Sequence, residues 1–229
     1  MKTFFRNTTL LVLLTLTVAF ISGCEREPSD AVDQDAIYTE YEIFYNQNED
    51  KSYARATFKF SNILGTKLEL ADGAEVSFNG DILSWKPAFA YYEKEYAGFV
   101  NTGTFTYVDL DGNTFQNTAT VEEIAYPEGF ETLDRSAAFE LIWQGTPLSD
   151  SGDVTVVVNG ENEGDAQTFF TSTDGANSII FGVDKLSQLG DGPGTVYMDR
   201  RNYGDHNGTS RGGYVVGRYR PTNATPVIE

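Results

Sequence analysis

The sequence predicts an all-β protein with two tandem antiparallel β-sandwiches and at most one short helix. Aromatic residues make up 14% of the 229 residues, including 13 Tyr and 16 Phe, a composition that favours strands over disorder. From Ile37 onward, polar and apolar residues alternate with a period of two, as in half-buried strands. Turn dipeptides such as Asn-Gly and Asp-Gly separate the alternating segments.

The first predicted domain spans 37–126 and holds about seven strands, the number expected of a small sandwich. The clearest strand is 53–60 (YARATFKF), which places Ala and Phe on one face and Arg, Thr and Lys on the other. Asn79-Gly80 predicts a hairpin within 76–85, and Asp111-Gly112 predicts a second within 104–121. Segments 37–45 and 88–96 complete this half.

The second predicted domain spans 130–229, because Tyr126-Pro127-Glu128-Gly129 interrupts the alternation. Its predicted strands are 138–143, 154–158, 167–172, 178–183, 195–203 and 212–220, the last two forming a hairpin. Asp184–Gly190 is the only helix-like segment, with Asp184 as N-cap and Gly190 as the stop. Both halves therefore have the size of immunoglobulin-like sandwiches, although the Cys…Trp…Cys framework is missing. One larger sandwich or barrel is the alternative.

Residues 1–23 have the pattern of an export signal. Lys2 and Arg6 precede an apolar run over 10–21 that ends in small residues. A spanning helix needs about 20 apolar residues, and this run is shorter. We therefore expect the segment to be removed.

The quartet Ile21-Ser22-Gly23-Cys24 resembles the lipobox of bacterial lipoproteins. This resemblance implies that Cys24 becomes the acylated first residue, carrying chains such as palmitate that hold the protein stably at a membrane. The alternatives are an ordinary secretory signal with a buried free thiol, or a signal anchor. Because Cys24 is the only cysteine, no disulfide within the chain is expected.

The second half also resembles uncharacterised tandem β-sandwich lipoproteins of Gram-negative bacteria. The resemblance rests on the strand around Trp143, the Leu186–Leu189 turn before the strand 196–200, and an arginine-rich last hairpin. It implies a cell-envelope location and brings no known activity. Glu25 is not the Asp that is associated with inner-membrane retention in enteric lipoproteins, so the outer membrane is expected, with a periplasmic or a surface-facing orientation left open.

Residues 24–36 are predicted to form an acidic, disordered tether. The segment is polar, contains Pro28 and lacks an apolar period. Twelve extended residues reach at most about 40 Å. A tether of this kind would let the folded part stand away from the membrane surface.

The charge balance excludes nucleic acid as a partner. The formal net charge is −18, and removing Lys2 and Arg6 with the signal leaves 14 basic against 34 acidic residues. Phosphate binding depends on neutralisation by Lys and Arg, so such a surface repels nucleic acid. The acidity favours solubility, with binding of calcium or of a basic partner as the alternative interpretation.

Asp109, Asp111 and Asn113 are a candidate Ca²⁺ site, because they offer oxygen ligands at alternate positions. The spacing departs from an EF-hand, since Gly112 is fourth and not sixth in the segment. A plain Asp-Gly hairpin turn is the competing interpretation.

Tyr92 and Tyr96 are candidate binding residues within an aromatic-rich segment that begins at Trp85. Exposed rings there could contact sugar faces or another protein. Alternation places Phe89 and Tyr91 on the opposite face, so one of the two sets is core. Ordinary sheet packing is the alternative.

Arg200, Arg201, Arg218 and Arg220 form a second candidate surface. Residues 196–229 are rich in arginine, whereas the preceding chain is strongly acidic. The arginines could dock an acidic partner. Alternatively, they pair with acids on neighbouring strands.

No catalytic residue is predicted. His206 is the only histidine and no second His or Cys completes a zinc site. The chain also lacks a serine-nucleophile elbow and a phosphate loop. The sequence thus favours a lipid-anchored, non-enzymatic envelope protein that binds or scaffolds a partner. No cofactor is expected apart from the candidate Ca²⁺. A carbohydrate-binding module and a hydrolase with unmarked carboxylates are the alternatives.

Overall fold

The computed structural model of the chain describes residues 26–162 and 164–229. Strands make up most of the described chain, which confirms the all-β prediction. In chain order they are β1 (Arg26–Pro28), β2 (Ile37–Asn46), β3 (Lys51–Phe60), β4 (Lys67–Glu69), β5 (Glu75–Phe78), β6 (Asp81–Ile82), β7 (Ser84–Lys86), β8 (Tyr91–Ala97), β9 (Thr102–Val108), β10 (Thr114–Thr120), β11 (Thr132–Leu133), β12 (Phe139–Ile142), β13 (Gly152–Gly160), β14 (Gln167–Thr171), β15 (Ser178–Phe181), β16 (Gly192–Gly204), β17 (Gly213–Arg220) and β18 (Val227–Ile228).

The strands form three sheets. The largest has twelve strands with the main order β1-β4-β3-β2-β17-β16-β13-β14, and β8, β7, β18 and β11 join it off this path. A four-stranded sheet has the order β10-β9-β5-β6, and β12 pairs with β15 in a third.

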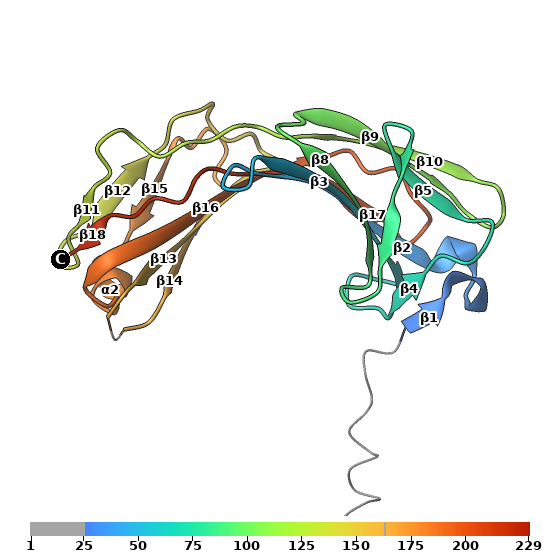
Figure 1. The fold of residues 1–229 in the computed structure, drawn as a ribbon, viewed down its shortest axis with the longest axis horizontal. Coiled ribbons are helices and arrows are strands. Elements are labelled where there is room, and N and C mark those ends of the chain that lie inside the picture. The colour runs from blue at the N-terminus through green and yellow to red at the C-terminus, as the bar shows by residue number, and fades with distance from the viewer. Residues whose placement is uncertain (1–25, 163) are drawn as a thin grey trace, which may run out of the picture.

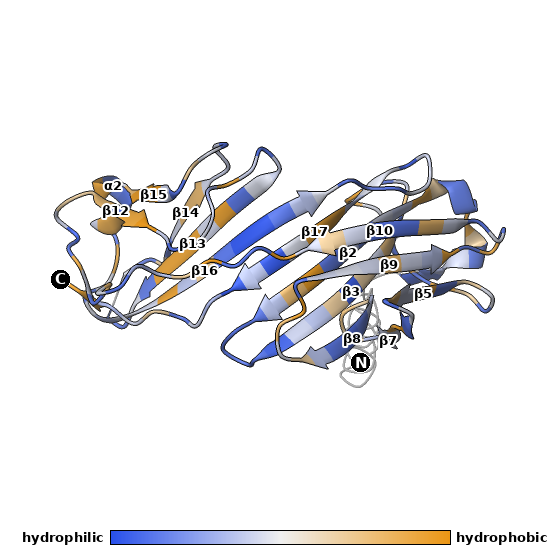
Figure 2. Ribbon diagram, turned by 90° about the horizontal axis from the view of Figure 1, so that it is seen from above, coloured by the Kyte–Doolittle hydropathy of each residue, from blue (hydrophilic) through white to orange (hydrophobic). Residues whose placement is uncertain are grey.

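The molecule is an arch whose concave side is the large sheet (Figure 1). The four-stranded sheet covers the convex side over β2, β3 and β17, and β12 with β15 covers the other end. Seen from above, β9 and β10 lie across the strands beneath them, and hydrophilic and hydrophobic residues are interspersed along the long strands (Figure 2). The result is a sheet-on-sheet architecture in which residues 26–162 and 164–229 leave the concave face of the large sheet uncovered.

The predicted division into 37–126 and 130–229 does not separate two sheets. β17 pairs in parallel with β2, from Gly213 opposite Thr39 to Arg220 opposite Asn46. β16 then pairs with β13 along most of its length and with β17 at its end. The last hairpin therefore returns to the first half, and one sheet contains strands of both predicted domains. Such pairing between distant segments leaves no local signal in sequence.

The covered face of the large sheet holds the apolar core. Tyr41 of β2 lies 5.2 Å from the Phe105 ring, and Phe58 of β3 lies 4.6 Å from the Tyr107 ring, measured between centroids. All four rings are almost fully buried. Burying a large apolar side chain stabilises a fold by about 1.5–3 kcal/mol, so these contacts hold the two layers together.

The predicted hairpins are confirmed. β5 and β6 are joined by Asn79 and Gly80, both with positive φ (51° and 88°), as a tight primed turn requires. β9 and β10 pair from Val108 opposite Thr114 onward. Local turn chemistry was sufficient to predict both.

The disordered-tether prediction is wrong for residues 26–36. β1 pairs in parallel with β4, and two 3-10 helices, η1 (Ser29–Ala31) and η2 (Gln34–Ala36), follow. Ser29 is fully buried, and its Oγ accepts a hydrogen bond from the Ala71 N–H at 2.9 Å. The Gln34 side chain donates to the Ser29 carbonyl at 2.8 Å. Polar side chains therefore fix this segment, which a search for an apolar period cannot detect.

The one short α-helix of the described residues, α2 (Val183–Leu186), overlaps the predicted helix-like segment Asp184–Gly190 and begins one residue before it. Its N-cap is Gly182, without a side-chain cap bond, so the assignment of Asp184 as N-cap is wrong. No helix in residues 26–162 and 164–229 has the length and apolar character needed to cross a membrane.

Candidate functional site

The concave face of the large sheet carries rows of side chains that run across the strands. In one row, register places Asp153, Arg201, Arg218, Phe44 and Tyr53 opposite one another in turn on β13, β16, β17, β2 and β3. Because the side-chain period of a strand is two, these residues point away from the covered core. The row brings together residues that lie far apart in the sequence.

A neighbouring row lies beside the first. It contains Tyr203, Val216, Glu42, Arg55 and Glu93, on β16, β17, β2, β3 and β8. Strands are about 4.8 Å apart, so five strands span roughly 19 Å. The two rows together form a polar and aromatic strip across the middle of the arch.

A hollow of about 470 Å³ lies in this strip. We call it the concave site and define it by its lining residues, Glu42, Ile63, Arg201, Tyr203, Tyr214, Val216 and Arg218. A smaller hollow of about 190 Å³ shares Glu42 and Tyr214 with it. Volumes of about 300–1,000 Å³ are typical of small-molecule sites, so the concave site has a suitable size.

Glu42 is the acidic centre of the concave site. Its carboxylate lies 3.2 Å from Arg218 Nε and 3.5 Å from Arg55 Nη1. Arg55 in turn donates through Nε to Glu93 at 2.8 Å. Burial lowers the pKa of Arg218 from the usual guanidinium value, against the opposing effect of Glu42. The carboxylate thus offsets part of the cost of placing an arginine in a partly dry position.

Two arginines of the strip lie over aromatic rings. The Arg218 guanidinium carbon lies 3.8 Å from the centre of the Phe44 ring, and that of Arg55 lies 4.9 Å from the centre of the Tyr53 ring. Such cation–π contacts hold a charged group in a fixed orientation. The Tyr203 and Tyr214 rings meet edge to face with centroids 6.2 Å apart, and Tyr203 is 38% exposed.

Of the four predicted arginines, the structure places Arg201 and Arg218 together in the concave site. Arg220 lies on the same face, where Nε and Nη2 each donate to Asp199 at 2.7 Å. This bidentate pair agrees with the alternative in which the arginines pair with acids.

Arg200 belongs to the opposite, covered face, so it does not join the predicted docking surface. Its side chain is 1% exposed and forms an ion pair with Glu122. It also donates to the carbonyl oxygens of Thr146 at 2.7 Å and Pro147 at 3.2 Å. Its role in the fold is therefore to connect strand and loops within the core.

Tyr92 and Tyr96 do not form an exposed ring surface. Tyr92 is 8% exposed, and its ring packs on Trp85 with centroids 4.9 Å apart. Tyr96 is half-buried and donates to Asp81 at 3.1 Å. In the opposite set, Phe89 is 62% exposed and stacks on Tyr91, which is half-buried like Tyr96. Alternation separated the two sets correctly, but the most exposed ring, Phe89, belongs to the set that was not chosen.

The Asp109, Asp111 and Asn113 segment forms a hydrogen-bonded turn. Asp109 Oδ1 accepts from the N–H groups of Asp111 at 3.0 Å and Asn113 at 2.8 Å, and Oδ2 accepts from Asn113 Nδ2 at 2.9 Å. Both carboxylate oxygens thus have donors within the turn, as in a plain Asp-Gly hairpin. Among the described residues, no group of three His, Cys, Asp or Glu side chains is placed to hold a metal ion.

His206 lies at the end of the covered face. Its Nε2 is 2.8 Å from Thr39 Oγ1, and its ring stacks on Tyr41 with centroids 6.2 Å apart. Burial lowers the pKa of His206 from its ordinary value. These contacts give it a packing role.

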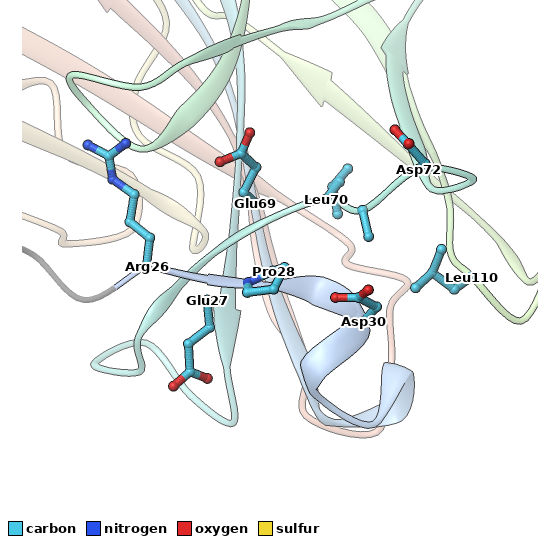
Figure 3. Close-up of a pocket in the computed structure, with 9 residues that line it drawn as sticks. Arg26, Glu27, Pro28, Asp30, Glu69, Leu70, Asp72 and Leu110 are labelled. Carbon is cyan, nitrogen blue, oxygen red and sulfur yellow. The ribbon is translucent and has the colours of Figure 1, made fainter.

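A second hollow of about 510 Å³ lies between the N-terminal segment and the chain after β4. Figure 3 shows Arg26 and Glu69 at one end, Asp30, Asp72 and Leu110 at the other, and Glu27 pointing away from them. Four of its nine lining residues are acidic and none is aromatic.

Sequence reasoning missed Glu42, Ile63, Tyr203 and Tyr214 as members of a site. Alternation puts Arg201 with Tyr203, and Tyr214 with Arg218, on shared faces. However, only the β2–β17 and β16–β17 registers bring them to one hollow. The predicted lipidation residue Cys24 and the signal 1–23 lie outside the described residues.

Comparisons with known proteins add little. No protein-family model matches the sequence, and no curated protein is significantly similar to it. A solved structure described as "Structural insight into host cell surface retention of a 1.5-MDa bacterial ice-binding adhesin" matches with 12% sequence identity and a TM-score of 0.29. The match covers 84% of this chain and 65% of that chain. A TM-score this low does not define a common fold.

Proposed function

We propose that this protein is a lipid-anchored, non-catalytic cell-envelope protein that binds a partner through the concave site. The observation that carries the binding role is the uncovered face of the large sheet, where Arg201, Arg218 and Glu42 meet two tyrosines around one hollow. Tyr and Arg are enriched where proteins bind partners. We use the term immunoglobulin-like only for the size and strand content of each half, because one sheet continues through both.

The anchor is proposed from the lipobox-like quartet that ends at Cys24, and the outer membrane is its proposed location. Only Glu25 lies between Cys24 and Arg26, where β1 begins. Two residues span at most about 7 Å. An acylated Cys24 would therefore hold the β1 end of the arch close to the membrane, without a long tether.

The other two functions have less support. A carbohydrate-binding patch at Tyr92 and Tyr96 lacks exposed rings, since Tyr92 is buried. For a hydrolase, Glu40 and Glu42 near the concave site are both engaged in salt bridges, with Lys59 and Arg218. We propose a binding role in preference to catalysis on these grounds.

The anchor is tested by metabolic labelling with an alkyne-bearing palmitate. The wild-type chain is expected to be labelled and to fractionate with membranes, and Cys24→Ala is expected to lose both properties. Ser22→Ala, which retains the cysteine, is the matched control. Labelling of Cys24→Ala at the wild-type level would contradict the anchor.

The binding surface is tested by photo-crosslinking in intact cells. A photoreactive phenylalanine replaces Tyr203 on the concave face or Gln116, which is exposed on β10 of the convex face. Crosslinked partners are expected from position 203 only. Equal products from both positions, or none from position 203, would refute binding through the concave site.

A further inference from the structure

We infer that the concave site binds a glycan that carries a carboxylate, as in a uronic acid residue, with Arg201 and Arg218 holding that group. This inference rests on the proposed binding role and adds the chemical class of the ligand. Three features support it: two arginines that face each other, incompletely used donors, and flanking rings.

Two arginines face each other in the concave site. Arg201 and Arg218 lie directly opposite each other on β16 and β17. Each has one acid nearby, Asp153 at 3.5 Å from Arg201 and Glu42 at 3.2 Å from Arg218. Like charges in this position destabilise a sheet, and these acids offset part of that repulsion. A carboxylate placed between the two guanidinium groups would be attracted to both.

Both arginines also have donors that remain poorly used. Arg201 reaches Asp153 only at 3.5 Å, and Arg218 Nη2 reaches Glu42 at 3.4 Å. Arg218 Nε is buried and has no hydrogen-bond partner of good geometry among the described residues, although the Glu42 carboxylate lies 3.2 Å away. By contrast, Arg220 is satisfied by two bonds of 2.7 Å to Asp199. A carboxylate can accept from guanidinium groups through two oxygens.

The remaining lining suits a sugar ring. Tyr203 and Tyr214 offer ring surface and hydroxyl groups, and Glu42 offers an acceptor. One face of a pyranose presents C–H groups that pack on an aromatic ring, while its hydroxyls need both donors and acceptors. The only aliphatic side chains that line the hollow are those of Ile63 and Val216, which is too little apolar surface for an acyl chain.

The structure disfavours the other anionic ligands. A peptide that extends a sheet needs an open strand edge, but β16, β17 and β2 each have neighbours on both sides at this site. A chain of net charge −18 repels polyanions. The repulsion is stronger for nucleic acid, which carries a phosphate at every nucleotide, than for a glycan with a carboxylate on every second sugar.

The test is calorimetric titration of the full chain, purified in mild detergent, with a hyaluronan tetrasaccharide, which contains uronic acid. Chitotetraose, of equal length without carboxylates, and a tetraglutamate peptide are the comparison ligands. We expect the hyaluronan probe to bind at least tenfold more tightly than either. Arg201→Gln and Arg218→Gln should each weaken this binding about tenfold, whereas Arg220→Gln, on the same face, should change it less than twofold.

The inference is overturned by absence of millimolar binding, by equal binding of chitotetraose or tetraglutamate, or by equal affinity of the Arg201→Gln chain. Circular dichroism verifies folding of each variant, and Arg201, whose side chain is one-third exposed, provides the second variant if Arg218→Gln does not fold. Crosslinking from position 203 to a protein, without binding of the hyaluronan probe, would refute the glycan and leave the proposed binding role intact. Absence of palmitate labelling in the wild-type chain would contradict the proposed lipid anchor and would leave the glycan inference untouched.

Discussion

Arg200 and Arg201 are neighbours in β16, yet they belong to opposite faces of the large sheet and to different environments. Arg200 is buried with Glu122 and loop carbonyls on the covered face. Arg201 lines the hollow on the concave face and is one-third exposed. The pleat alone separates them, because successive side chains point to opposite sides.

The same difference holds along the whole sheet. Aromatic rings such as Tyr41 and Phe58 fill the covered face, whereas Glu42, Arg55 and Arg218 form a charged network on the concave one. An antiparallel sheet commonly has one face on the core and one toward solvent. Stability is therefore expected to depend on the covered face, and binding on the concave face.

The largest effect is expected from core truncation. Phe58→Ala should lower the free energy of unfolding by about 3–5 kcal/mol, because it removes a buried ring and leaves a cavity. Thr57→Ala, the adjacent position on the concave face, should change it by less than about 0.5 kcal/mol. Urea unfolding followed by tryptophan fluorescence measures both. Similar losses in the two variants would break the distinction between the faces.

Glu122→Ala is expected to lower the free energy of unfolding by about 3 kcal/mol, because it leaves Arg200 as an unpaired charge in the core. Asp153→Ala removes the partner of Arg201, and there water can solvate the exposed guanidinium, so the cost should not exceed about 1 kcal/mol. Thermal and urea unfolding at pH 7 compare the two. An equal cost would show that Arg200 reaches solvent.

The Arg220–Asp199 pair on the concave face should contribute about 0.5–1 kcal/mol, since both side chains are partly exposed and screened by solvent. A double-mutant cycle with Arg220→Gln and Asp199→Asn isolates this coupling. The coupling should weaken at 1 M salt. A coupling above about 2 kcal/mol that resists salt would instead indicate an environment as dry as that of Arg200.

The smallest effect is expected from pH. Burial lowers the pKa of His206 in the folded protein below its ordinary value of 6.5, so the unfolded chain binds the proton more readily. Burying His206 in its neutral form therefore does not lower the free energy of unfolding above about pH 6.5. As the pH falls from 6.5 toward the folded-state pKa, the unfolded chain takes up the proton first and the free energy of unfolding decreases. His206→Gln should flatten the decline between pH 7.5 and 5.5 in urea midpoints. An unchanged decline would assign it to other groups.

Much of the fold was predictable from local patterns. Strict alternation identified 53–60 as a strand, and Asn79-Gly80 and Asp111-Gly112 identified two hairpins. Alternation also separated Tyr91 from Tyr92, but it could not tell which of them faces the core. That choice depends on where the covering sheet lies.

Other features needed distant partners. The segment 26–36 is held by polar contacts of Ser29 and Gln34 with residues more than 40 positions away, so its composition was misleading. Of the seven residues that line the concave site, the sequence indicated only Arg201 and Arg218 as candidates.

The sequence by itself determined that the chain is all-β, where its tight turns lie, and which side chains share a strand face, because these follow from the two-residue period and turn chemistry. The lipobox-like quartet at Cys24 was likewise a matter of sequence alone. Only the tertiary structure decided that β17 lies beside β2 and which face of the sheet is covered. It also decided that Arg201 of β16 lies opposite Arg218 of β17. Strand pairing across more than 160 residues depends on the packing of the whole chain, and no local segment encodes it.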